Sequence, residues 1–208
     1  NQVDVAMSIL PIKYRIEQNK LFRLSSTAPK LAEKPYQFRE HVNDMTKIII
    51  PSVSSERRIY IPIGYLDEQS IVSNSAFAIY DAPIYLFGIL TSIIHMVWMK
   101  AVGGKLKTDY RYSAQLCYNT FPFPKITAAQ KSEIEDAALN VIAAREAHYE
   151  KTLAEMYNPD KMPTDLKDAH HKLDMIVDRC YRREPFLNDN ERLEYLFKMY
   201  EKMANKDK

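Results

Sequence analysis

Glycine is scarce in this chain. Only four of its 208 residues are glycine, namely Gly64, Gly88, Gly103 and Gly104, which is about 2% against a usual share of roughly 7%. No three of them have the spacing of a G-x-G-x-x-G segment or of a phosphate-binding P-loop. We therefore expect the chain to carry no loop for a dinucleotide, for ATP or for S-adenosylmethionine.

A change in composition at residues 122–124 (PFP) predicts a domain boundary. The chain up to Pro124 has 14 Lys and Arg against 10 Asp and Glu, a net charge of +4, and the remainder has 15 against 17, a net charge of −2. Proline continues neither a helix nor a central strand. We predict one domain at residues 1–124 and a second at residues 125–208.

The second domain carries the start and stop signals of three helices. The starts are Thr127 with Gln130, Pro163 with Thr164, and Asn188 with Glu191, of which the first and third have capping-box spacing. Asn158-Pro159 stops the first helix or the turn that follows it, and Pro185 ends the second. Apolar residues recur at helical spacing after each start. This pattern predicts a small all-α three-helix bundle.

The first domain alternates between short strands and one long apolar helix. Lys47–Pro51 (KIIIP) and residues 58–62 (RIYIP) are β-rich runs that end in proline, and residues 70–80 have room for two further short strands. Asp81 is expected to cap the next helix, which continues to about Ala101 and ends at Gly103 in the left-handed conformation. The expected fold class is an α+β domain followed by the helical bundle.

Catalytic, metal and membrane signals are weak. The five histidines have no metal-ligand spacing, and no nucleophile motif is present. Cys117 and Cys180 are too few for a disulfide framework, which favours a reducing, cytoplasmic compartment. The longest apolar stretch, residues 82–102, is interrupted by polar residues and is interpreted as a buried helix, not a membrane span. We expect no enzyme activity, metal or membrane contact on this chain.

A basic and aromatic segment gives the best local signal of function. Lys105, Lys107 and Arg111 can neutralise phosphates or donate to guanine, and Tyr110 and Tyr112 are interleaved with them. The carboxylate of Asp109 would repel a phosphate backbone, but it can accept a hydrogen bond from cytosine N4. In a strand, positions 107, 109 and 111 would project to one face and read a base pair. A solvated strand of mixed charge explains the same pattern.

Polar residues further upstream are additional candidates for contacts to a nucleic acid. Arg57 and Arg58 lie between the two β-rich runs, where they would contact phosphate or form an ordinary charged hairpin end. Ser52, Asn74 and Ser75 could reach base edges, or they could only serve the turns that these residue types favour.

Several segments together resemble a known family. They are residues 50–58 (IPSVSSERR), 82–92 (APIYLFGILTS), 104–113 (GKLKTDYRYS), 118–124 (YNTFPFP) and 181–186 (YRREPF). These segments resemble the target recognition domain and C-terminal helical domain of MmeI-like (type IIL) restriction-modification enzymes and related adenine-N6 DNA methyltransferases. The resemblance covers about residues 30 to 200.

The resemblance implies that the chain is a fragment that recognises a specific double-stranded DNA sequence. In that family a separate domain of the same polypeptide binds S-adenosylmethionine and methylates adenine, and some members also cleave DNA. This fragment would dock that methyltransferase domain on its site for base flipping. The positions of Lys107 and Asp109 hold a base-reading pair in the family, and this Lys-x-Asp version places guanine on the strand that Lys107 contacts. Arg111 falls on a further reading position.

A second hypothesis remains open at this point. The chain could be a protein-interaction or scaffold module without DNA binding, whose weakly acidic helical half is the partner surface. The dependence of duplex-DNA affinity on salt separates the two hypotheses, because phosphate contacts release counterions.

Overall fold

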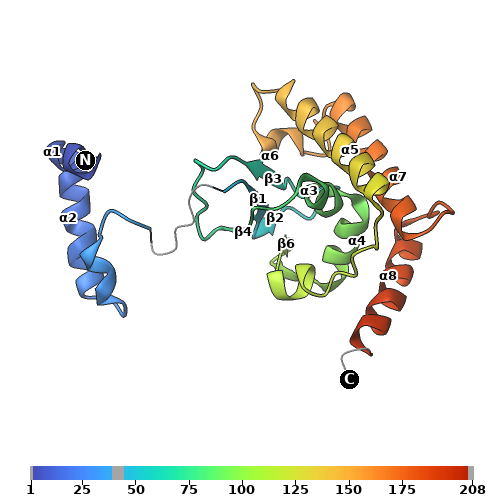
Figure 1. Ribbon diagram of the computed structural model, residues 1–208, viewed down its shortest axis with the longest axis horizontal. Coiled ribbons are helices and arrows are strands. Elements are labelled where there is room, and N and C mark those ends of the chain that lie inside the picture. Colours follow the sequence, from blue (N-terminus) through green and yellow to red (C-terminus); the bar gives the residue numbers. More distant parts are fainter. Residues whose placement is uncertain (1, 39–44, 206–208) are drawn as a thin grey trace. The chain divides into compact units, whose positions relative to one another are not determined.

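The computed structural model describes residues 2–38 and 45–205. The chain falls into two compact units, Asn1–Asp44 and Met45–Lys208 (Figure 1). The predicted boundary at Pro124 lies within the second unit, where helices from both sides of it pack together. Small antiparallel sheets and several helices make the fold mixed α and β, as expected.

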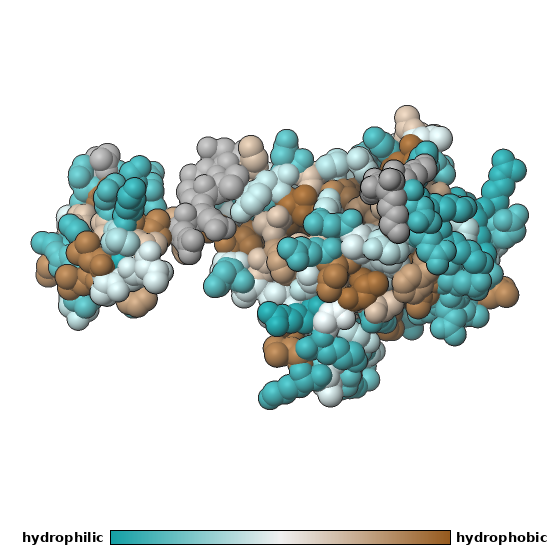
Figure 2. Space-filling view, turned by 90° about the horizontal axis from the view of Figure 1, so that it is seen from below, coloured by the Kyte–Doolittle hydropathy of each residue, from teal (hydrophilic) through white to brown (hydrophobic). Residues whose placement is uncertain are grey.

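Local polar contacts hold the first unit together. Its elements are α1 (Gln2–Ser8), α2 (Leu10–Leu24) and a 3₁₀ turn, η1 (Pro29–Glu33). The guanidinium of Arg23 donates to the carbonyl oxygens of Leu31 and Lys34, both at 2.9 Å. Ala32 is buried, but large apolar side chains such as Phe22 are exposed, and hydrophobic surface is visible on this unit in Figure 2. The unit therefore has little core of its own among the described residues.

A three-stranded antiparallel sheet opens the second unit. The predicted strand at Lys47–Pro51 is confirmed as β1, and it lies between β3 (Gly64–Leu66) and β4 (Ala76–Tyr80). Ile48 and Ile50 are fully buried on one face. On the other face Ile49 lies opposite Gly64, where an added Cβ would be 2.7 Å from the Ile49 Cγ2 atom. Glycine is required there by the close approach.

Two strand predictions in this region are wrong. Residues 58–62 form no strand, because the backbone N–H of Ile61 bonds to the sulfur of Met96 at 3.2 Å and Pro62 has no N–H for a ladder. Residues 70–80 hold one strand, β4, instead of two. The preceding loop is held by buried Lys47, whose Nζ donates to the carbonyl oxygen of Ser70 at 2.7 Å.

A second three-stranded sheet carries the basic and aromatic segment. Its strands are β2 (Val53–Ser54), β6 (Asp109–Arg111) and β5 (Gly104–Leu106), in that spatial order and all antiparallel. Only Ser52 separates β1 from β2. The chain therefore passes directly from the first sheet into the second, which places residues 52–58 beside the hairpin of β5 and β6.

The predicted long apolar helix is two helices. α3 (Ile84–Thr91) and α4 (Ile93–Val102) are bent by 61° at Ser92. Ser92 has an extended backbone, and its hydroxyl donates to the carbonyl oxygen of Ile89 at 2.6 Å, which competes with helix continuation. Among the described residues no single helix is long and apolar enough to cross a membrane, and this bent pair passes that test only as a pair.

Both predicted ends of the long helix need correction. Asp81 does not cap α3, since the N-cap residue is Pro83 and Asp81 itself has a left-handed φ of 51°. Gly103 follows α4 as expected, but its φ is −70°, which is not left-handed. Glycine is needed at 103 for space, because a Cβ would lie 2.5 Å from the carbonyl oxygen of Met99.

The three predicted C-terminal helices are present as α5 (Ala128–Glu146), α7 (Thr164–Tyr181) and α8 (Asp189–Ala204), with a short α6 (Leu153–Met156) before Asn158-Pro159. The capping box of Thr127 and Gln130 is confirmed. At α8, Asn188 accepts from the Glu191 N–H as expected, but the Glu191 carboxylate accepts from Leu187 at 2.7 Å. A capping box would have this carboxylate accept from the N–H of Asn188, so that half of the prediction is wrong by one residue.

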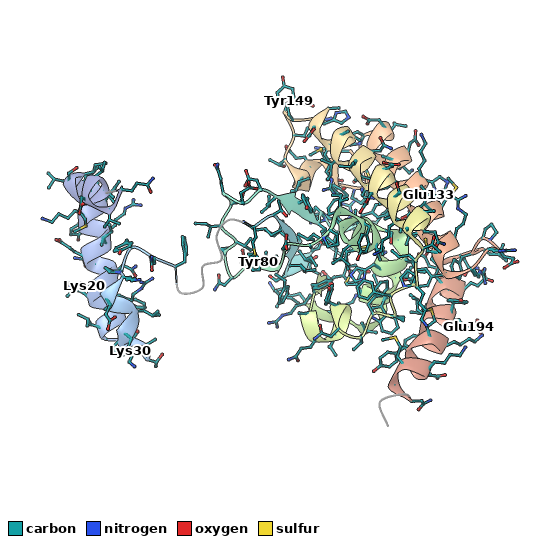
Figure 3. All side chains as sticks on the ribbon, in the orientation of Figure 1. Lys20, Lys30, Tyr80, Glu133, Tyr149 and Glu194 are labelled. Atoms are coloured by element: carbon teal, nitrogen blue, oxygen red, sulfur yellow. The ribbon has the colours of Figure 1, made fainter. Side chains whose placement is uncertain are left out.

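The C-terminal helices pack on the N-terminal half as well as on each other. α5 packs against both α7 and α3, and α8 packs on α4 (Figure 1). In the contact between α4 and α8, Trp98 packs against the rings of Phe197 and Tyr200. A three-helix bundle is therefore not confirmed. Glu133 of α5 and Glu194 of α8 point outward to solvent (Figure 3), and one continuous core lies beneath these helices.

Candidate nucleic-acid interface

The predicted base-reading residues lie on a β-hairpin. Leu106 of β5 pairs with Asp109 of β6, so that Lys107 and Thr108 form the turn between the strands. Lys107 has a left-handed φ of 58°, which two-residue hairpin turns favour and an extended strand excludes. The expectation that positions 107, 109 and 111 share one strand is therefore wrong for Lys107. Asp109 and Arg111 keep that spacing on β6, and Lys107 is exposed at the tip.

Backbone pairing brings the upstream serines to the same sheet. Arg111 lies opposite Val53 of β2, and the N–H of Tyr112 donates to the carbonyl oxygen of Ser52 at 2.9 Å. The Ser52 hydroxyl donates in turn to the carbonyl oxygen of Ser75 at 2.6 Å. Asn74 is exposed in the adjoining loop. Three segments that are distant in sequence thus meet at the end of β6.

The loop with Arg57 and Arg58 lies along the hairpin. The backbone N–H of Glu56 points at Oδ1 of Asp109, 3.4 Å away, and Nζ of Lys105 lies 3.9 Å from the Glu56 carboxylate. Lys105 also lies over the ring of Tyr110, 5.1 Å from its centroid. Within this arrangement Asp109 retains free acceptor capacity, because a carboxylate accepts about four hydrogen bonds.

Tyr112 is the one candidate that the structure places in the core. Its side chain is 3% exposed, and its hydroxyl lies 3.1 Å from Nε2 of His95 on α4. Burial lowers the pKa of His95 to about 3, so the imidazole is neutral at physiological pH. Tyr112 therefore supports β6 from beneath, and the period-2 alternation of the strand explains why Arg111 beside it is exposed.

The sequence gives no signal for Asp160, which contacts the loop that carries Arg57. Nη2 of Arg57 is 2.6 Å from Oδ2 of Asp160, in the turn between α6 and α7. In the sequence, Asn158-Pro159 indicates a helix stop and gives no sign of a contact to Arg57. No local signal could identify a partner 103 residues away. A crevice of about 120 Å³ between the two segments is lined by Ser55, Arg57, Arg58, Ala154, Asn158 and Pro159.

The surface around β6 combines side chains that can donate and accept hydrogen bonds. It offers cations from Lys105, Lys107 and Arg111, a carboxylate from Asp109 and hydroxyl or amide groups from the neighbouring loops. Within residues 2–38 and 45–205, no group of three or more His, Cys, Asp or Glu side chains could hold a metal ion. A larger cavity of about 620 Å³ lies between α5 and α7, away from these residues, and four of its lining residues are acidic.

Comparison with known proteins assigns the chain to a family. The family described as "MmeI, target recognition domain" matches residues 1–125, and "MmeI, C-terminal domain" matches residues 126–206. This chain belongs to the MmeI target recognition domain family. The resemblance to MmeI-like restriction-modification enzymes and DNA methyltransferases that the sequence suggested is thereby confirmed.

Two relatives of this MmeI-family chain are informative. DNA methyltransferase A of Bacillus subtilis (strain 168) is 52% identical over 199 residues, which cover 94% of this chain and 22% of the relative. A solved structure of the type IIL restriction-modification enzyme MmeI in complex with DNA superposes with a TM-score of 0.84 at 39% identity, covering 93% of this chain and 26% of that one. The chain thus spans only about a quarter of the length of these relatives.

Proposed function

We propose that this MmeI-family chain is the sequence-specific double-stranded DNA recognition part of an adenine-N6 DNA methyltransferase or restriction-modification enzyme. One observation carries the proposal: the fold gathers cations, a carboxylate and polar loop side chains from three distant segments onto one exposed surface around β6. Duplex DNA presents phosphates and base edges that require this mixture. The solved MmeI relative, which was determined with DNA, supports the same conclusion.

Each group on the surface takes a role from its chemistry. Lys107 and Asp109 read one G·C pair, with guanine on the strand that Lys107 contacts, and Arg111 reads a further position. Arg57, Arg58 and Lys105 contact phosphates, and Tyr110 supports Lys105 through its ring. Ser52, Asn74 and Ser75 contact neighbouring base edges, which is supported by their position together at the end of β6.

The catalytic steps belong elsewhere in the parent protein under this proposal. A methyltransferase domain of the same polypeptide binds S-adenosylmethionine, and this chain positions that domain on its site so that adenine can be flipped into it. Residues 1–124 form the recognition domain and residues 125–208 the helical domain. The change of family match between residues 125 and 126 supports that boundary.

The salt dependence of duplex affinity tests DNA binding. Affinity should fall linearly on a plot of log K against log salt, with a slope of about −0.9 for each phosphate contacted. A flat plot would contradict the proposal and favour the alternative, a protein-interaction or scaffold module. The acidic cavity between α5 and α7 is the feature that favours this alternative, because its four carboxylates would repel DNA.

A charge swap tests the assignment of the base-reading pair. Changing Lys107→Glu together with Asp109→Arg in the full-length protein should reverse the orientation of one recognised G·C pair. Loss of a good bidentate contact costs about 1–3 kcal/mol of discrimination. If the preferred DNA sequence stayed the same, the two residues would not be the reading pair.

A further inference from the structure

The ion pair of Arg57 and Asp160 joins the two halves of the chain on the proposed DNA-binding surface. Nη2 of Arg57 lies 2.6 Å from Oδ2 of Asp160, and both side chains are about two-thirds exposed, at 63% and 66%. An exposed pair of this kind contributes little to stability, typically about 0–1 kcal/mol. Either partner can therefore be released from the pair at little cost to the stability of the fold.

Both partners are held in place by their own backbone segments. The N–H of Asp160 donates to the side-chain oxygen of Asn158 at 3.0 Å, and the N–H of Lys161 donates to the Asn158 carbonyl oxygen at 3.0 Å. On the other side, a turn closes from the N–H of Arg58 to the carbonyl oxygen of Ser55 at 3.2 Å. The pair forms where two independently built turns meet.

Under the proposed function Arg57 contacts a DNA phosphate, and in this structure its guanidinium is paired with Asp160 instead. The Arg57 loop is attached to the hairpin through the contact between Glu56 and Asp109, so a duplex read by Asp109 passes close to Arg57. A guanidinium binds a carboxylate and a phosphate with the same paired N–H geometry. An uncompensated carboxylate at this point would also repel a phosphate.

We propose that Asp160 is an internal counter-ion for Arg57, which occupies the guanidinium in the free protein and yields it to a DNA phosphate on binding. This inference rests on the proposed function and adds a feature that limits the affinity of the protein for DNA. Because the exchange leaves the Asp160 carboxylate beside the DNA, it lowers affinity for every duplex. The contact also contributes less to the salt dependence than a free arginine would.

A double-mutant cycle on the full-length protein tests the exchange. Wild type, Asp160→Asn, Arg57→Ala and the double variant are titrated with one duplex of arbitrary sequence across a series of salt concentrations. Asp160→Asn should tighten binding about two- to fivefold, in proportion to an exposed ion pair, and steepen the salt slope by up to about 0.9. Arg57→Ala should weaken binding, and adding Asp160→Asn to it should give a smaller gain in affinity than Asp160→Asn gives in wild type, because only the repulsion of phosphate by Asp160 is then removed.

The matched control is Asp168→Asn, which removes an equal charge from an exposed aspartate of α7 on the acidic cavity. It should leave affinity unchanged. An equal gain from Asp160→Asn with and without Arg57 would overturn the exchange, because Asp160 would then act by general repulsion. If affinity depends on salt but Asp160→Asn leaves it unchanged, the exchange is overturned as well, and the proposed function still stands. Salt-independent affinity in all variants would overturn both.

Discussion

The carboxylate of Asp174, in the middle of α7, accepts a hydrogen bond from the backbone N–H of Ile93 at 2.7 Å and so caps α4 from a different helix. Its second oxygen accepts from the hydroxyl of Tyr60 at 2.6 Å. Tyr60 follows the Arg57 loop, and α4 leads into the hairpin of β5 and β6. A single buried carboxylate of the C-terminal half therefore fixes both segments that carry the proposed DNA contacts.

Asp174 should make stability depend on pH in a defined direction. Burial raises the pKa of Asp174 from 3.8 to about 7. The folded state therefore holds a proton that the unfolded state has lost, and this group's contribution to the free energy of unfolding falls as pH rises from about 4 to about 7. Burial lowers the pKa values of His95 and His170 to about 3, which gives the opposite slope below about pH 6.5.

Comparing wild type with Asp174→Asn isolates the carboxylate, because both histidines are present in each protein. Urea unfolding at several pH values should show the advantage of wild type over the variant shrinking as pH rises through that window. Asp174→Ala should be less stable throughout by about 1–3 kcal/mol, since it leaves the N–H of Ile93 and the Tyr60 hydroxyl without their acceptor. A pH-independent difference for Asp174→Asn would show that Asp174 does not titrate there.

Arg145→Lys should destabilise the protein by about 1–3 kcal/mol. Arg145 is 8% exposed, and its guanidinium donates to the carbonyl oxygen of Ile63 and to the hydroxyl of Tyr157, both at 2.8 Å. A lysine ammonium is a single point of charge and cannot span the two acceptors, which leaves a buried polar group unpaired. Arg179→Lys, an exposed control 3.9 Å from Glu133, should change the unfolding free energy by less than about 0.5 kcal/mol.

Gly88→Ala should destabilise the contact between α3 and α5. An added Cβ would lie 2.6 Å from Cγ2 of Ile134 and 3.2 Å from Cβ of Ala138, and such overpacking costs about 1–3 kcal/mol. Ile134→Ala removes the clashing methyl group, so chemical denaturation of the double variant should show a smaller loss than the sum of the single variants. Strict additivity would mean that α3 moves away from α5 at little cost.

Comparing Lys107→Gly with Lys107→Met should distinguish the effect of the backbone conformation at residue 107 from the effect of its side-chain charge. The left-handed φ of 58° at Lys107 costs an L-residue roughly 1 kcal/mol or more, and glycine adopts it freely. Thermal unfolding should therefore show Lys107→Gly to be more stable than Lys107→Met. Both variants should lose discrimination at one base pair by about 1–3 kcal/mol. Unchanged discrimination in both would remove Lys107 from the reading surface.

Much of the local structure could be predicted because its causes are local. The capping box of Thr127 and Gln130, the N-cap at Asn188 and the strand at Lys47–Pro51 depend on residues a few positions apart. The break at Ser92 could not be predicted, because the apolar residues around it show no clear periodicity and the N–H of Ile93 is capped by Asp174, 81 residues away. The same limit applies to residues 58–62, where a bond to Met96 replaces a strand ladder.

The candidate DNA-binding surface was likewise only partly predictable from the sequence. The sequence by itself determined which residue types are present, and several segments together, residues 104–113 among them, were enough to indicate the family. Only the tertiary structure decided that Lys107 turns the hairpin, that Tyr112 is buried against His95, and that Asp160 holds Arg57. The physical reason is that the residue type alone sets the chemistry of a side chain. The contact partners of that side chain depend on packing between segments that are distant in the sequence.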